Sequence, residues 1–328
     1  LHHHTMKQIE VRNMEILISL SAALIGGLLL SRLAKRLSLP AVTAYLVTGL
    51  LLGPFCIGAL NISGLGFVSM EAVEHLNILS QVALGFIAFT IGNEFRVSQL
   101  KTMGRQASAG GILQAVAATA LVDTALILLH LVRPEIISVS SAITLGSIAA
   151  ATAPAATLMV VRQYKADGPM TRLLLLVVAI DDAVGLVLFS ASFGVAVALE
   201  SGAVSVVTVL VEPVAEIVLS LALGALAGLA LYWVEQFFHS RSKRLSISIG
   251  FVLLTAGLSM KEFEVGGIHC GFSLLLVCMM TGTLFCNICD FSEELMARVD
   301  GWTAPLFVLF FVLSGAELDL SVLRNPSV

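Results

Sequence analysis

Two adjacent carboxylates, Asp181 and Asp182, lie in the middle of a long apolar run. Residues 173–189 read LLLLVVAIDDAVGLVLF and carry no other charge. A charged side chain at the centre of a bilayer costs about 2.5 to 3.5 kcal/mol on insertion scales, and such residues are usually retained for function. The alternative is a pair that serves helix packing, held protonated or matched by a basic residue. We favour a functional pair in which a carboxylate binds a hard cation and releases its proton as the cation binds.

The two carboxylates cannot both face one cavity equally, because adjacent helical residues point about 100° apart. We therefore expect different roles for them. One ligates the cation, and the other pairs with a basic group or completes the ligand shell. Competition between a cation and a proton for one carboxylate is sufficient to exchange one ion against the other.

The apolar segment before this pair contains a candidate helix break. Residues 149–157 read AAATAPAAT, and Pro154 both removes a backbone donor and disfavours helical geometry at Ala153. A broken helix at membrane depth persists only where it is buried in protein or lines a cavity. We predict a break at Ala151, Ala153 and Pro154 whose free carbonyls ligate a small cation together with the Thr152 hydroxyl. An ordinary proline kink is the alternative.

The whole chain is strongly apolar. Of its 328 residues, 58% are apolar and 12% are charged, whereas soluble domains are about one quarter charged. A helix needs roughly 20 apolar residues to cross the hydrocarbon core. The predicted fold class is an all-α polytopic membrane protein with ten apolar segments: 14–33, 40–60, 77–93, 108–132, 136–162, 171–199, 204–238, 244–260, 267–288 and 302–319.

Two further features of composition bound the interpretation. Residues 1–5 read as the remnant of a purification tag, with Met6 as the expected natural start, so their histidines are no metal site. The net charge of -4 is spread over short gaps with no basic run. A nucleic-acid partner is therefore not expected, because such a partner needs a basic surface along its phosphates.

Basic residues alternate between the gaps that separate the apolar segments. Only Arg133, Lys261 and Arg324 follow even-numbered segments, and Lys7 and Arg12 precede the first. Since lysine and arginine accumulate in cytoplasmic loops, this pattern predicts ten crossings of the cell inner (plasma) membrane with the N-terminus outside. The remaining thirteen follow odd-numbered segments: Arg32, Lys35, Arg36, Arg96, Lys101, Arg105, Arg162, Lys165, Arg172, Arg241, Lys243, Arg244 and Arg298.

The seventh segment is too long for a simple crossing, because about 35 residues at 1.5 Å each extend roughly 50 Å. We expect its first part, with Glu212 and Glu216, to lie along the outer interface and the rest to link two bundles.

Asp123, in the fourth segment, is a candidate for a proton path, or a lone carboxyl hydrogen-bonded to a neighbour. Cys286 and Cys289 have the spacing of half a zinc or redox site, but without a second pair they are expected to be buried thiols.

A short motif occurs twice. Residues 92–100 and 315–323 both fit Gly-x-Glu-apolar-x-apolar-Ser-x-Leu. The copies lie seven segments apart, so the helices that carry them cross the membrane in opposite directions. This arrangement is the inverted-topology repeat of many secondary transporters, although similar apolar helices also produce such matches by chance.

These residues together resemble the sodium/proton antiporters of the cation/proton antiporter superfamily, in the electrogenic-type branch with an Asp-Asp pair. The likeness covers essentially the whole chain and rests on residues 179–186, the broken fifth segment, the loop 32–40 and residues 49–54. It implies an inverted-repeat homodimer of thirteen spans whose core moves against a scaffold as an elevator. Asp182 is then the principal cation and proton ligand, and Asp181 pairs with a lysine on a later span. This sequence is expected to lack the last three spans, so that its second repeat is truncated.

The resemblance also divides the chain and assigns its activity. Residues 6–107 and 244–328 become the scaffold, residues 108–199 the core and residues 200–243 the linker. The chain is expected to be a transporter and no enzyme, exchanging Na⁺ or Li⁺ for H⁺ without a cofactor or any metal besides the transported cation. Its partners are these ions, membrane lipid and a second copy. The alternatives are a sodium-coupled organic-anion symporter and a non-transporting membrane sensor or assembly module.

Overall fold

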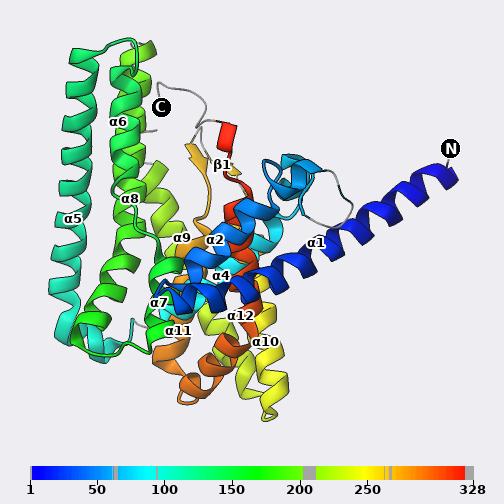
Figure 1. Ribbon diagram of the computed structural model, residues 1–328. Coiled ribbons are helices and arrows are strands. Elements are labelled where there is room, and N and C mark those ends of the chain that lie inside the picture. Colours follow the sequence, from blue (N-terminus) through cyan, green and yellow to red (C-terminus); the bar gives the residue numbers. More distant parts are fainter. Residues whose placement is uncertain are drawn as a thin grey trace. The chain divides into compact units, whose positions relative to one another are not determined.

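The described residues form α-helices and a small β-hairpin (Figure 1). The computed structural model describes residues 2–60, 62, 66–93, 95–201, 212–261, 263–265 and 268–321, and the side chains at some of these positions, including Asp182, lie outside the description. The elements are α1 (His2–Arg36), α2 (Ala41–Leu52), the 3-10 helix η1 (Ile57–Leu60), α3 (Met70–Glu74), α4 (Asn77–Gly92), α5 (Val97–Val132), α6 (Val139–Ile148), α7 (Pro154–Tyr164), α8 (Pro169–Ser201), α9 (Glu212–Gln236), α10 (Arg241–Ser259), β1 (Phe263–Val265), β2 (Ile268–Cys270), α11 (Leu274–Ile288) and α12 (Ser292–Ala316).

Each predicted apolar segment contains helix in the described part of the chain. Two shorter helices, α6 and α11, are apolar as well. The chain is therefore a multi-pass membrane protein, whereas the count of ten crossings stays a prediction. Among the residues that the structure describes, six stretches are long and apolar enough to cross a bilayer: Met14–Arg36, Ala41–Leu60, Met70–Gly92, Gly104–Val132, Val214–Gln236 and Ser292–Ala316.

The structure departs from the all-α prediction at the start of the ninth segment. Strands β1 and β2 pair antiparallel there, with Val265 opposite Ile268, and α11 begins only at Leu274 rather than at 267. Gly266-Gly267 between two short apolar runs is a hairpin signal. Hydropathy missed it, because an apolar strand and the first turn of an apolar helix look alike over so few residues.

Helix ends also differ from the apolar boundaries. Helix α5 begins at Val97, well before the predicted residue 108. Hydropathy indicates where a chain enters the hydrocarbon core, whereas a helix begins where its backbone hydrogen bonding starts. Helix α9 begins at Glu212. Of the predicted interfacial part of the seventh segment, Glu212 and Glu216 belong to this helix, whereas residues 204–211 lie outside the described residues.

The chain forms two compact units, of which the first comprises residues 1–84, 159–165 and 301–328. Within it α2 packs on α1 and crosses α12. The Gln163 side chain caps α2 by accepting a hydrogen bond from the Ala41 backbone N–H at 2.7 Å. Near this cap the Arg162 guanidinium lies 5.3 Å from the centre of the Phe307 ring. The Gln163 side chain thus satisfies a backbone N–H that the start of α2 leaves free.

The second unit comprises residues 85–158 and 166–300. Within it α5, α6 and α8 pack against one another, as the green helices of Figure 1 show, and α9 packs on α10 and α11. Glu235 of α9 is fully buried. It accepts a hydrogen bond from Ser248 at 3.0 Å and lies 3.9 Å from the Arg244 guanidinium. A buried carboxylate is stable only with such partners.

Two helix crossings place glycine against backbone. In the first unit, a methyl group on Gly49 would overlap the Val312 carbonyl oxygen, and one on Gly315 would overlap that of Leu46. In the second unit, a methyl group on Gly92 would overlap the Met279 carbonyl oxygen, and one on Gly282 would overlap that of Phe89. Both crossings, α2 with α12 and α4 with α11, therefore require the absence of a side chain.

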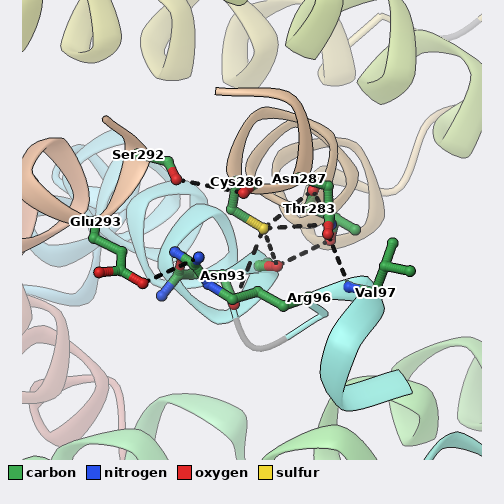
Figure 2. Close-up of polar contacts among 9 residues, drawn as sticks. Asn93, Arg96, Val97, Thr283, Cys286, Asn287, Ser292 and Glu293 are labelled. Carbon is green, nitrogen blue, oxygen red and sulfur yellow. Dashed lines mark hydrogen bonds and ion pairs between the residues drawn. The ribbon is translucent and has the colours of Figure 1, made fainter. Parts of the chain in front are cut away.

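A polar joint connects the end of α4 to the end of α11 and the start of α12 (Figure 2). Asn287 accepts a hydrogen bond from the Val97 N–H at 2.8 Å and donates to the Phe95 carbonyl at 2.9 Å. Thr283 donates to the Gly92 carbonyl at 3.2 Å. Arg96 forms an ion pair with Glu293 at 3.2 Å. These bonds occupy the backbone groups that the helix ends leave free.

Candidate functional site

The candidate site is centred on Asp181, well inside α8. Its side chain is fully buried. The flanking leucine, valine and alanine residues belong to one continuous helix, in which the backbone groups bond to one another. The carboxylates are therefore the polar groups of this stretch that need partners from elsewhere. Asp182 follows in the same helix, but its side chain lies outside the described residues.

The fifth apolar segment is divided into α6 and α7. Helix α6 ends in tight turns in which the N–H groups of Ala149, Ala150 and Ala151 donate to carbonyls three residues earlier. Helix α7 starts at Pro154, a first position where the missing N–H leaves no hydrogen bond unmade. Residues 151–153 are therefore non-helical between a helix C-terminus, which carries partial negative charge, and a helix N-terminus, which carries partial positive charge.

This break lies beside the carboxylate. The Thr152 hydroxyl interacts with the Asp181 carboxyl, yet the hydroxyl oxygen is buried and makes no well-formed hydrogen bond within the described residues. Gly185, one turn after Asp181, brings α8 to 4.0 Å from the Ala151 backbone, measured from where a methyl group would lie. The structure thus brings Asp181, Thr152 and Ala151 together.

A third helix contributes a residue that the sequence interpretation missed. The Gln114 carboxamide on α5 lies against the Asp181 carboxyl, and with its nitrogen assigned to the side of Asp181 it donates to Oδ2 at 2.7 Å and to Oδ1 at 3.2 Å. A glutamine in a long helix gives no signal by itself. Only the packing of α5 on α8 reveals its partner.

Asp123 also lies on α5, nine residues after Gln114, or about 13 Å along the helix axis. Its carboxylate touches Gly146 of α6 so closely that a methyl group there would overlap Oδ1. That oxygen is buried and has no hydrogen-bond partner within the described residues. Asp123 is therefore a second carboxyl among the packed helices α5, α6 and α8.

The paired cysteines have structural surroundings. Cys286 is buried and its thiol lies 3.1 Å from the Thr283 carbonyl oxygen, within the polar joint of Figure 2. Cys289 is buried too, and burial raises the pKa of its thiol. Neither cysteine forms a disulfide, as expected for buried apolar residues.

The geometry around Asp181 suits a small hard cation. Carboxylate, hydroxyl and carbonyl oxygens are the ligands that hard cations prefer. A helix interrupted in an apolar bundle, with a buried carboxylate beside the interruption, is typical of secondary transporters.

Comparison with known proteins agrees with that class. The chain matches the family described as "Sodium/hydrogen exchanger, transmembrane" over residues 20–328, and it therefore belongs to this family. It is 32% identical over 102 residues to K(+) efflux antiporter 5 of Arabidopsis thaliana, a match that spans 31% of this chain and 16% of the plant protein.

Solved structures show the same fold. The sodium proton antiporter MjNhaP1 from Methanocaldococcus jannaschii at pH 8 is similar with a TM-score of 0.68 and 20% identity, over 96% of this chain and 73% of that one. An electron-microscopy structure of the same archaeal antiporter gives a TM-score of 0.67 and 19% identity, over 92% and 69% of the two chains. At this level of identity the likeness concerns the fold alone.

Proposed function

We propose that the chain exchanges a monovalent cation, Na⁺ or Li⁺ in preference to K⁺, for protons across the membrane. The observation that carries this proposal is the buried Asp181 carboxyl facing the Thr152 hydroxyl at the break between α6 and α7. Ionised carboxylates inside an apolar bundle are destabilising. A cation or a proton bound at the pair Asp181 and Asp182 lowers that cost, and alternation between the two at Asp182 gives exchange.

The roles of the site residues follow from this chemistry. Asp182 is the group that binds either the cation or the proton, and Asp181 supports it with charge. Thr152 supplies a hydroxyl oxygen with free lone pairs. Ala151, Ala153 and Pro154 keep the backbone open so that carbonyl oxygens complete the ligand shell.

Many secondary transporters that alternate access are built from inverted repeats, and the glycine crossings support such a repeat here. The repeated motif aligns Gly92 with Gly315. Gly282 meets the carbonyl three residues before Gly92, and Gly49 meets the carbonyl three residues before Gly315.

The relation is reciprocal. Gly92 meets the carbonyl three residues before Gly282, and Gly315 meets the carbonyl three residues before Gly49. Thr281 and Thr48, which precede the partner glycines, each donate to the carbonyl four residues earlier. The α4–α11 crossing thus repeats the α2–α12 crossing in detail, which is expected if residues 6–107 and 244–328 are repeats that form a scaffold.

The proposal also includes the orientation of the protein in the membrane, its dimerisation and the motion of its core. We place the N-terminus outside the inner (plasma) membrane, on the bias of lysine and arginine between gaps. The scaffold residues dimerise with a second copy, the core of residues 108–199 moves against them as an elevator, and residues 200–243 link the two.

The proposal is tested with the full-length natural protein in liposomes that contain a pH-sensitive dye. An imposed proton gradient should collapse on addition of Na⁺ or Li⁺ and more slowly on addition of K⁺. The potassium arm matters because the plant relative is named for K⁺ efflux. No cation-driven proton movement would exclude antiport, and uptake of an organic anion with sodium would indicate the symporter.

A further inference from the structure

The starts of α10 and α12 meet at a pocket within the second unit. None of the residues around Asp181 lines it. Arginines from both helices converge there, and the lining contains a single carboxylate. The pocket is lined by Arg241 and Arg244 of α10, by Phe291 just before α12, and by Glu294, Leu295 and Arg298 of α12.

One carboxylate oxygen serves two of these arginines. Glu294 Oε1 lies 3.2 Å from Arg241 Nε and 2.9 Å from a terminal nitrogen of Arg298. A guanidinium carries five N–H donors, so a single oxygen accepts only a small part of what the two arginines offer. The pocket therefore presents more positive charge and more donors than Glu294 balances.

The third arginine, Arg244, is held in place by its surroundings. Its Nε donates to the Phe238 carbonyl oxygen at 2.6 Å, and its guanidinium lies 3.7 Å from the centre of the Phe291 ring. On the buried side the Glu235 carboxylate lies 3.9 Å from the same Nε. A guanidinium stacked on an aromatic ring and bound through Nε keeps both terminal nitrogens for an oxyanion.

The first turn of α10 is basic where a helix favours acidic residues. It carries Arg241, Lys243 and Arg244 and no acidic residue. A helix N-terminus has partial positive charge, so cations there are unfavourable and an anion is favourable. The preference of basic residues for cytoplasmic gaps explains their presence, but it does not explain why they converge with Arg298 of another helix.

Aromatic residues indicate the level of this pocket in the membrane. Trp233 and Phe237, one turn apart at the end of α9, are exposed, and exposed tryptophan at a helix end is typical of the headgroup region. Glu235 lies between them in the chain and contacts Arg244. The pocket therefore lies at the level where phospholipids carry their phosphate groups.

We propose that this pocket binds a phosphate group, supplied by the headgroup of an anionic phospholipid or by free phosphate in the cytoplasm. Basic pockets between transmembrane helices on the cytoplasmic side bind such headgroups. Arg241, Arg244 and Arg298 donate to the phosphate oxygens, with Arg241 and Arg298 spaced by their shared contact with Glu294. The inference goes beyond the proposed antiport and uses only its orientation in the membrane.

Thermal stability of the full-length protein in detergent tests the site without transport. A ligand that binds the folded protein raises the apparent Tm. Dihexanoyl phosphatidylglycerol, a soluble anionic phospholipid, and inorganic phosphate are titrated separately at constant ionic strength. A response to the phospholipid alone assigns the lipid headgroup as the source, and a response to inorganic phosphate shows that the free anion suffices.

Two arginine substitutions test the residues of the pocket. Arg241→Gln/Arg298→Gln should raise the half-saturating concentration of the active probe by roughly tenfold or more, since each arginine near the membrane surface adds to the attraction for anionic lipid. Lys165→Gln/Arg172→Gln is the control. It removes the same charge from the gap between α7 and α8, which we place on the same side of the membrane, and it should behave as wild type.

A substitution of the opposite sign gives a second comparison. Glu294→Gln should lower the half-saturating concentration several-fold, because it removes the carboxylate that competes with phosphate for Arg241 and Arg298. Asp167→Asn is its charge-matched control, since Asp167 forms an ion pair with Arg172 at 3.1 Å outside the pocket, and it should leave binding unchanged.

Three outcomes would overturn the proposal. They are no response of the wild type to either probe, an unchanged half-saturating concentration in Arg241→Gln/Arg298→Gln, and an equal weakening in Lys165→Gln/Arg172→Gln. If the double arginine variant does not fold, Arg241→Gln alone decides, because this side chain is 75% exposed. The measurement uses no ion gradient, so a failure of the proposed antiport leaves it unaffected.

Discussion

Asp181 and Asp182 occupy consecutive positions of α8. Consecutive helical positions are rotated by about 100°, which permits different roles for the two residues. Asp181 is surrounded by protein, with Gln114 and Thr152 against its carboxyl. A carboxyl so enclosed has no direct access to water. The exchanging role proposed for Asp182 requires the opposite property, which is access for a cation from water.

The first prediction tests this division of roles. Asp182→Asn should abolish cation-driven proton movement, because the amide keeps the volume but neither exchanges a proton nor attracts the cation. Asp181→Asn should be milder, retaining exchange with a raised apparent KM for the cation. Both are measured by dye dequenching in proteoliposomes at matched protein content. Sodium-dependent proton release that survives in Asp182→Asn would refute the assignment of the exchanging group.

Part of this site was predictable from the sequence. Asp181 was conspicuous because a charged side chain inside an apolar run is removed from water at a cost in free energy. Pro154 was conspicuous because proline lacks a backbone N–H and interrupts a helix. Gln114 was not predictable. Its contact with Asp181 depends on which face of α5 meets α8, a tertiary fact that the sequence of a long apolar helix does not specify.

At the scale of elements, glycine determines how closely helices cross. Gly282→Ala should lower the apparent Tm in detergent, because the added methyl group overlaps the Phe89 carbonyl oxygen, and overpacking of this kind typically costs about 1 to 3 kcal/mol. Gly257→Ala is the matched control, since nothing lies within 4 Å of the added methyl group. It should hold or raise the apparent Tm, because alanine favours helix over glycine. Equal effects of the two variants would contradict the tight crossing.

The break between α6 and α7 is the second element whose geometry can be tested. Pro154→Ala restores a backbone donor and allows α7 to extend toward α6, which displaces the carbonyls proposed as ligands. The apparent affinity for Na⁺ should fall while the protein remains folded. Pro305→Ala, which removes a proline inside α12, is the control and should leave the affinity unchanged. An unchanged affinity in Pro154→Ala would reduce the break to an ordinary proline kink.

Element boundaries show why hydropathy predicts helices better than their ends. The apolar runs located α4 within a residue of its observed limits, because the run and the helix end at the same polar joint. They misplaced the start of α5, whose first turns carry polar residues such as Ser98 and Lys101. They also hid the β-hairpin before α11, because strands of three residues are too short to show a period.

For the whole molecule, the distribution of charge predicts orientation in the membrane. Arg162, Lys165 and Arg172 flank the gap between α7 and α8, so this gap should face the cytoplasm. The gap between α5 and α6 contains one basic residue, Arg133, and should face outside. The two gaps are separated by one predicted crossing, which makes them a sensitive pair for testing topology.

A membrane-impermeant maleimide distinguishes the two sides in intact cells. Glu135→Cys, at a side chain 65% exposed between α5 and α6, should be labelled without permeabilisation. Ala166→Cys, at an exposed position between α7 and α8, should be labelled only after the membrane is opened. The unmodified chain serves as the control for its natural thiols, of which Cys278, Cys286 and Cys289 are buried. Labelling of both positions from one side would show that no crossing separates them. The reverse pattern would place the N-terminus in the cytoplasm, because successive crossings alternate in direction.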